Sequence, residues 1–225
     1  MIWMTICRSN RWCSYDKWSF LDTVIFVVYY KNSIYQYERV AMIISPEAKE
    51  VLDFWLDEET RPFWFDVSED FDQELKARFG ATLKQAAQGE LYWWRQTALG
   101  RVAEIIVLDQ FSRNIYRGTP KAFQQDPMAL VLAQTLVDMP EEYDSLDPSL
   151  QKWAIMPYMH SESVLIHEEA LRLFSELGEP VSLDFEVMHK EIIERFGRYP
   201  HRNEILGRES SAEELAFLEE PNSSF

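Results

Sequence analysis

Hydrophobic residues between positions 45 and 218 recur at the three- and four-residue spacing of helices. Phe71, Leu75 and Phe79 are four residues apart, Ser68 stands where an N-cap is expected, and Gly80 follows the last of them. This pattern predicts a helix that begins after Ser68 and ends at Gly80. No segment shows the strict alternation of a half-buried strand, so we expect an all-α protein.

Other segments carry equally clear helix signals. The stretch 99–108 is apolar on nearly every side, which predicts a central, buried helix that ends by Gly118. Ser45 followed by Pro46 predicts the first helix. Further starts are expected at Thr119-Pro120, Asp126-Pro127, Asp147-Pro148, Ser161, Ser182 and Ser210 with Glu213, and further ends at Gly178 and Gly197. The short connections should make neighbouring helices antiparallel, although the sequence has no exact internal repeat.

Composition narrows the class of protein. The chain has 225 residues, 47% of them hydrophobic, enough to form the core of one domain. Its net charge of -16 argues against nucleic acid and anionic membranes as partners. The longest apolar stretch, residues 23–30, is too short to span a bilayer, so we expect a cytoplasmic protein without a membrane partner.

Residues 1–41 differ from the rest of the chain. They hold five of the 22 basic and three of the 38 acidic residues, and both cysteines, Cys7 and Cys13. The remainder therefore has no thiol with which to form a disulfide or a thiolate metal site. We expect Met42 to be the natural initiator and residues 42–225 to form one domain; the alternative is a loosely packed arm. The intact mass of the natively expressed protein distinguishes the two.

A first cluster of polar residues follows the apolar helix. Asp109, Arg113 and Arg117 fall on one helical stripe, with Gln110 and Asn114 beside it. One interpretation is a buried clamp in which one carboxylate meets two guanidinium groups. The other is an anion site in which an arginine keeps donors for a phosphate or carboxylate.

A second cluster, His160 and Glu162, is expected at the opening of a helix that also carries His167. His160 and His167 are seven residues apart, about 10 Å along a helix, so one metal ion cannot bind both. No complete set of metal ligands is present, and we predict neither a metal nor a cofactor. His160 is expected to bond a neighbouring carboxylate, and His167 to lie on the surface.

A third cluster inverts the local charge of this acidic chain. Its four arginines lie within fourteen residues: Arg195, Arg198, Arg202 and Arg208. Glu191 and Glu194, each four residues earlier, are expected to neutralise the first two. Arg202 and Arg208 have no obvious local partner except Glu204 and Glu209.

Three strings, LDQFSRNIYRGTPKAF, MPYMHSES and FGRYPHRNEILGRESSAEELAFL, occur in this order, with VLDFW near residue 51. Together they make residues 43–225 resemble the bacterial family called domain of unknown function 924. The resemblance implies a tetratricopeptide-like superhelix of stacked antiparallel helical hairpins and no established activity. It implies a shared site at Asp109, Arg113, Asn114, Arg117, His160, Glu162, Arg198, His201, Arg202, Asn203 and Arg208.

Two functions follow as hypotheses, and we favour the first. It is a binding module whose Arg/His/Asn-lined pocket takes a small anion or an acidic peptide. The second is a hydrolase- or transferase-type enzyme in which His160 or His201 is the general acid or base, oriented by Glu162 or Asp109. No known catalytic motif accompanies these residues. A third interpretation is that the clusters are structural ion pairs between helices. The sequence predicts no oligomeric state.

Overall fold

The computed structural model describes residues 27–30, 33–36, 44–221 and 223–224, and it divides into two units, residues 1–41 and 42–225. In the first unit β1 (Val27–Tyr30) pairs antiparallel with β2 (Ser33–Gln36). These segments lack strict alternation, but their β-branched and aromatic residues favour strands. The predicted start at Met42 lies outside the described residues.

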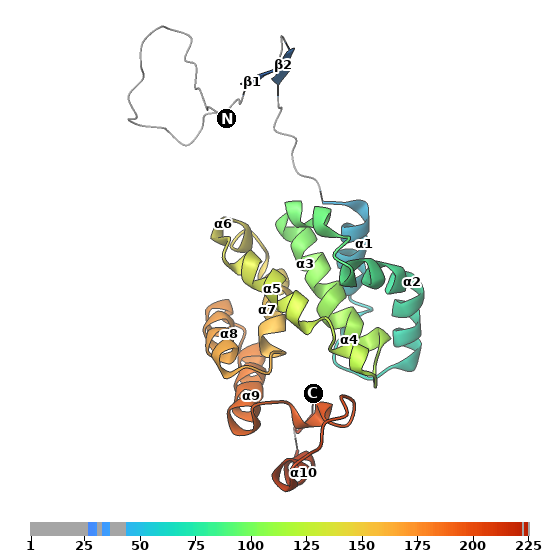
Figure 1. Cartoon of the computed structure of the whole chain (residues 1–225), viewed down its shortest axis with the longest axis vertical. Helices are drawn as coiled ribbons and strands as arrows, with labels where there is room; N and C mark the ends of the chain where they lie inside the picture. The colour runs from blue at the N-terminus through green and yellow to red at the C-terminus, as the bar shows by residue number, and fades with distance from the viewer. Residues whose placement is uncertain (1–26, 31–32, 37–43, 222, 225) are drawn as a thin grey trace, which may run out of the picture. The chain divides into compact units, whose positions relative to one another are not determined.

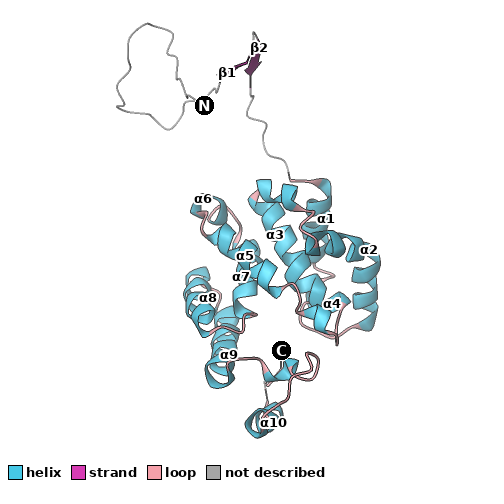
Figure 2. Ribbon diagram, in the orientation of Figure 1, coloured by secondary structure: helices cyan, strands magenta, loops and turns pink. Residues whose placement is uncertain are grey.

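The described part of the second unit is helical, which confirms the all-α prediction (Figure 2). In this described part ten α-helices are joined by loops, several of which contain short 3-10 or π segments. The α-helices are α1 (Pro46–Trp55), α2 (Glu69–Ala87), α3 (Ala98–Ile106), α4 (Ser112–Ile115), α5 (Asp126–Val137), α6 (Pro140–Tyr143), α7 (Pro148–Met159), α8 (Val164–Leu177), α9 (Pro180–Phe196) and α10 (Ala212–Leu218). The short segments are η1 (Arg61–Phe63), η2 (Tyr92–Gln96), η3 (Val107–Phe111), η4 (Pro120–Ala122) and η5 (Pro200–Arg202).

Helix α3 is the central helix, as its apolar sequence predicts (Figure 1). It contacts α1, α5 and α7, and the chain then continues through α7, α8 and α9, each packed on the one before. Residues 102–108 are buried. The tetratricopeptide-like superhelix stays a prediction. In the described part, none of the helices combines the length and apolar character that crossing a membrane requires.

Two groups of buried side chains hold the helices together. In the larger group Trp55 contacts Trp153 edge to face, with ring centroids 5.3 Å apart, and lies 5.6 Å from Phe111. These rings join α1 and α7 to η3, the segment that follows α3. The smaller group includes Ile193 of α9 and Tyr199, and it positions the loop that carries the third cluster. Aromatic rings of this size contribute a large share of the burial energy.

Several predicted helix boundaries are confirmed and others are wrong. Ser45 and Ser68 cap α1 and α2, and Gly178 and Gly197 end α8 and α9 in the left-handed conformation. Gly80 does not end α2, which continues to Ala87 because further apolar residues extend its buried face.

Other helix starts differ from the prediction by one to three residues. The capping box of α10 is Ser211 with Glu214, one residue later than expected, because the SSAEE string offers the same spacing twice. Helix α8 begins after Ser163, and α9 begins at Pro180 with Glu179 as N-cap. Thr119 precedes only a short 3-10 turn. Asp147 precedes α7 as expected.

Candidate functional site

The first and third clusters meet at the carboxylate of Asp126, which was predicted to cap a helix, and the second cluster joins them through Asp109 and Arg208. Asp126 is the first residue of α5 and makes no capping hydrogen bond. Arg113 instead donates to both of its oxygens at 3.0 Å, and Arg202 donates through Nη1 to Oδ2 at 3.2 Å. The only feature of the sequence that points to Asp126 is that no basic residue lies three or four positions from it to pair with its carboxylate. We call the residues gathered at this point the junction: Asp109, Arg113, Phe123, Asp126, His160, Glu162, Tyr199, His201, Arg202, Asn203 and Arg208.

Asp109 is the second carboxylate of the junction and is 1% exposed. Arg113 donates to its Oδ1 at 3.0 Å, Gln110 donates to its Oδ2 at 2.6 Å, and Nδ1 of His160 lies 2.7 Å from Oδ1. Burial opposes ionisation, but Arg113 and His160 outweigh it and lower the pKa of Asp109 to about 2. Asp109 lies in the π-helical segment η3, a widened turn often found at functional sites.

His160 does not open a helix as predicted. It is the C-cap of α7, which contains Pro157 and ends at Met159. The expected bond to a carboxylate is present, although the partner is Asp109, 51 residues earlier, rather than a neighbour in the sequence. Burial and the nearby Arg113 lower the pKa of His160, so the ring is neutral at pH 7.

Glu162 and Arg208 form a third ion pair, which is half-buried. Arg208 donates to the two oxygens of Glu162 at 2.6 and 2.9 Å, and the backbone N–H of Tyr199 donates to Oε1 at 2.8 Å. Burial works against ionisation, and the bonds from Arg208 and Tyr199 outweigh it and lower the pKa of Glu162. This pair fixes the loop after α9 against the end of α7.

Arg202 differs from the other junction arginines. It is 6% exposed and lies between two aromatic rings, with its guanidinium carbon 4.4 Å from the ring centre of Tyr199 and 4.6 Å from that of Phe123. Its Nε is buried without a partner among the described residues. Burial and the positive charge of Arg113 lower the pKa of Arg202, whereas the pKa of Arg113 is raised. The charge of Arg202 is therefore incompletely compensated.

Tyr199 and Phe123 are junction residues that the sequence analysis missed. The hydroxyl of Tyr199 donates to the carbonyl of Met159 at 2.5 Å, and Arg208 donates to the carbonyl of Tyr199. The string RFGRYPHR places an aromatic residue between arginines, and this pattern could have indicated cation–π contacts from the sequence.

His201 and Asn203 flank Arg202 in the sequence and carry further buried polar atoms. Nδ1 of His201 and Oδ1 of Asn203 are buried and have no partner in the described part of the chain. Burial, with Arg202 close by, lowers the pKa of His201 to about 4, so the ring is neutral. Nδ2 of Asn203 donates to Ser210 at 3.0 Å.

Three predicted site residues lie in clamps elsewhere. Arg117 donates to Asp72 of α2 at 2.6 and 2.9 Å, and Asn114 donates to the same carboxylate at 3.1 Å. Arg117 therefore does not share Asp109 with Arg113. Arg198 donates to Glu214 at 2.6 and 2.8 Å, which ties the loop to α10.

Other predicted ion pairs are also wrong, because the folded chain offers partners that spacing in the sequence cannot reveal. Arg195 binds Glu213, and Glu194 pairs with Lys190 instead of Arg198, which lies beyond the end of α9. His167 is fully buried, not on the surface, and its Nδ1 lies 2.7 Å from Glu186.

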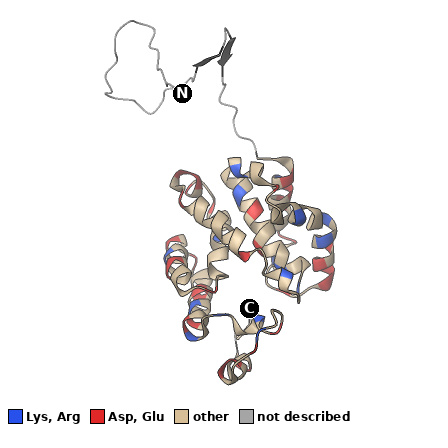
Figure 3. Cartoon of the chain, viewed as in Figure 1, with Lys and Arg blue, Asp and Glu red and all other residues tan. Residues whose placement is uncertain are grey.

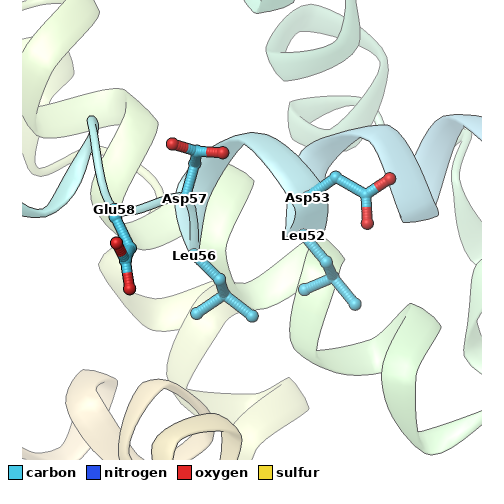
Figure 4. A pocket seen from close by; sticks show the side chains of 5 residues that line it. All are labelled: Leu52, Asp53, Leu56, Asp57 and Glu58. Atoms are coloured by element: carbon cyan, nitrogen blue, oxygen red, sulfur yellow. The ribbon is translucent and has the colours of Figure 1, made fainter.

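Two open surface pockets lie away from Arg202. One, of about 510 Å³, lies at the end of α1 and is lined by Leu52, Leu56 and three acidic residues, so its charge disfavours anions (Figure 4). Another is lined in part by Asn114 and Arg117 with their partner Asp72. Acidic and basic residues are mixed over the helices (Figure 3). Within the described ranges, no group of three or more His, Cys, Asp or Glu side chains is placed to hold a metal ion.

Comparison with known proteins places this geometry in a family. The model of the family described as bacterial protein of unknown function (DUF924) matches residues 51–222. The chain belongs to this family. The junction is therefore a feature of a DUF924 protein.

A solved structure supports the same assignment. The chain is similar to a protein of unknown function from Agrobacterium tumefaciens, with a TM-score of 0.72 and 34% identity over 77% of this chain and 97% of that one. The search of curated proteins gave no match. These comparisons establish the family and the fold.

Proposed function

We propose that this protein binds a small anionic molecule at the junction and that Arg202 is the residue that anchors it. The observation that carries the proposal is the incomplete compensation of Arg202. It has one hydrogen bond to a carboxylate, at 3.2 Å, and that carboxylate already accepts two bonds from Arg113. A buried guanidinium with a donor left over is costly in the empty protein, and an anion relieves that cost.

The surroundings of Arg202 suit an anion. The rings of Phe123 and Tyr199 hold the guanidinium plane in place, so little side-chain entropy is lost on binding. His201, whose titration is affected by Arg202, supplies a polar atom, Nδ1, that lacks a partner among the described residues. A guanidinium that is 6% exposed is better suited to a small carboxylate or phosphate than to a peptide chain.

Charge balance limits the site to a weakly charged ligand. Three guanidinium groups, Arg113, Arg202 and Arg208, face three carboxylates, and the histidines of the junction are neutral. A ligand with one or two negative charges leaves the junction modestly negative. A polyanion would be repelled by these carboxylates and by the net charge of -16.

The test is thermal unfolding with succinate and with inorganic phosphate. At one hundred times the dissociation constant, linkage predicts about 2.7 kcal/mol of stabilisation. For a protein of this size the midpoint then rises by about 5 to 10 °C. Arg202→Met should abolish the rise. Arg117→Met removes the same charge from a clamp and should keep it.

Two outcomes contradict the proposal. One is that neither anion raises the unfolding midpoint of the wild type. The other is that Arg202→Met keeps the full rise, which would place the anion at another basic group.

A further inference from the structure

Asp109 sets the tautomer of His160. Asp109 is ionised and buried, so it accepts hydrogen bonds, and Nδ1 of His160 at 2.7 Å must be the donor. The proton of the neutral ring is then on Nδ1, and the lone pair is on Nε2. Gln110 and Arg113 hold the carboxylate from two other directions, so the ring orientation is fixed as well.

Nε2 of His160 is available to a ligand. It makes no hydrogen bond within the described residues and is not among their buried atoms, and the side chain is 15% exposed. His167 contrasts with it, since Nδ1 contacts Glu186 and Nε2 lies 2.9 Å from the carbonyl of Ser161. Because the pKa of His160 is lowered, its Nε2 accepts a proton at neutral pH.

His160 and Arg202, the proposed anion-binding residue, are linked by a continuous series of hydrogen bonds. Nη1 of Arg113 donates both to Asp109, which holds His160, and to Asp126, which holds Arg202. The negative charge of Asp126 also acts on the titration of His160. The fixed imidazole and the incompletely compensated guanidinium therefore belong to one network.

We propose that His160 is a general base, positioned by Asp109, and that the junction hydrolyses a carboxylic ester whose separate anionic group is held by Arg202. This inference rests on the proposed function. His160 is the catalytic residue because its Nε2 meets the attacking water. Asp109 is a positioning residue because it acts through His160.

The reaction uses water as the nucleophile. Nε2 takes a proton from water, the water oxygen forms a bond to the acyl carbon, and the carbonyl π pair moves to the carbonyl oxygen. That pair then re-forms the carbonyl as the bond to the alcohol oxygen breaks, and the alcohol oxygen takes the proton from Nε2. One ester and one water become one acid and one alcohol, and His160 returns to its neutral form.

An acyl group fits these residues better than a phosphoryl group. Phosphoryl transfer needs positive charge on the oxygens of the transferred group itself. Arg113 and Arg208 are each engaged by carboxylates, and Arg202 is used for anchoring. Attack on a neutral acyl carbon starts from an uncharged group and places a single negative charge on one oxygen, and the water is activated by a base, which His160 supplies.

The experiment measures release of 4-nitrophenolate from mono-4-nitrophenyl succinate by the full chain. We expect His160→Gln to lower kcat by about 100-fold with little change in KM. Arg202→Met should mainly raise KM, and Arg117→Met should match the wild type. Circular dichroism and the unfolding midpoint show whether each variant is folded.

Asp109→Asn tests the positioning role. Asp109 raises the pKa of His160, so losing its charge should move the acid limb of the kcat/KM profile to lower pH as well as reduce kcat. A purely structural role would lower the amount of active protein without moving that limb.

Equal release by the wild type and His160→Gln, including no release by either, overturns the inference. If succinate still raises the unfolding midpoint in that case, the proposed function stands and only the catalytic role fails. If succinate has no effect either, both fail. An acid limb that stays in place in Asp109→Asn removes the positioning role.

Discussion

Arg117 and Arg202 carry the same charged group in motifs of the same family, and the structure uses them differently. Arg117 is 36% exposed and donates twice to Asp72, so its charge is fully matched. Arg202 is buried, shares Asp126 with Arg113 and keeps an Nε without a partner among the described residues. The comparison teaches that an arginine in a motif indicates a binding site only where its charge is left incompletely paired.

The largest expected effect is on the shared carboxylate. Asp126→Ala leaves Arg202 without its carboxylate and Arg113 with Asp109 alone, and it should lower the free energy of unfolding by about 3 to 5 kcal/mol. Asp72→Ala, in the more exposed clamp, should cost about 1 kcal/mol. Urea unfolding followed by circular dichroism measures both. Equal losses would mean that the junction and the clamp do not differ.

A smaller effect is expected from pH, and it comes from two buried histidines, His201 of the junction and His189 of α9, because the clamp has no histidine. Burial lowers the pKa of His189 to about 3 and that of His201 to about 4, against about 6.5 when unfolded. Tyr199, His160, His167 and Arg202 lie around these rings.

The sign follows from proton binding. Above pH 6.5 both rings are neutral in the folded and unfolded states, and they do not affect stability. Between about pH 6.5 and 4 the unfolded state binds more protons than the folded state. The free energy of unfolding therefore decreases as the pH is lowered, by up to about 1.4 kcal/mol per pH unit for each ring. His189→Gln should reduce this slope, measured by urea unfolding at pH 7, 6 and 5. An unchanged slope would contradict it.

The smallest expected effect is the difference in stability between the Arg202→Met and Arg117→Met variants without ligand. Arg202→Met removes an incompletely paired buried charge and keeps an apolar side chain between the two rings, so stability should change by less than about 1 kcal/mol, in either direction. Arg117→Met should cost up to about 1 kcal/mol. A loss of several kcal/mol in Arg202→Met alone would make Arg202 a structural residue.

The sequence predicts the helices better than it predicts the pairs of charges. Ser45, Ser68, Gly178 and Gly197 act locally, so their caps and stops could be read from spacing. Gly80 shows the limit of such signals, because burial of the next apolar turn outweighs the cost of a glycine inside a helix, about 1 kcal/mol.

Ion-pair partners depend on how the helices pack. Arg117 reaches Asp72 across 45 residues, and Arg202 reaches Asp126 across 76. Spacing suggested partners four residues away for Arg195 and Arg198, and both suggestions were wrong. The three motifs did point to the region of the junction and contain Tyr199 and Phe123, whereas the partnership of Asp126 with Arg113 and Arg202 could be recognised only from the folded arrangement.

The most direct measurement is the NMR signal of the Arg202 Nε–H group in ¹⁵N-labelled protein, assigned by its loss in Arg202→Met and followed during titration with succinate. The account predicts a saturable shift of this signal and no shift of the Arg117 signal, because the Nε of Arg117 already donates to Asp72, whereas that of Arg202 has no partner among the described residues. An Arg202 signal that stays in place while succinate is added would contradict the account.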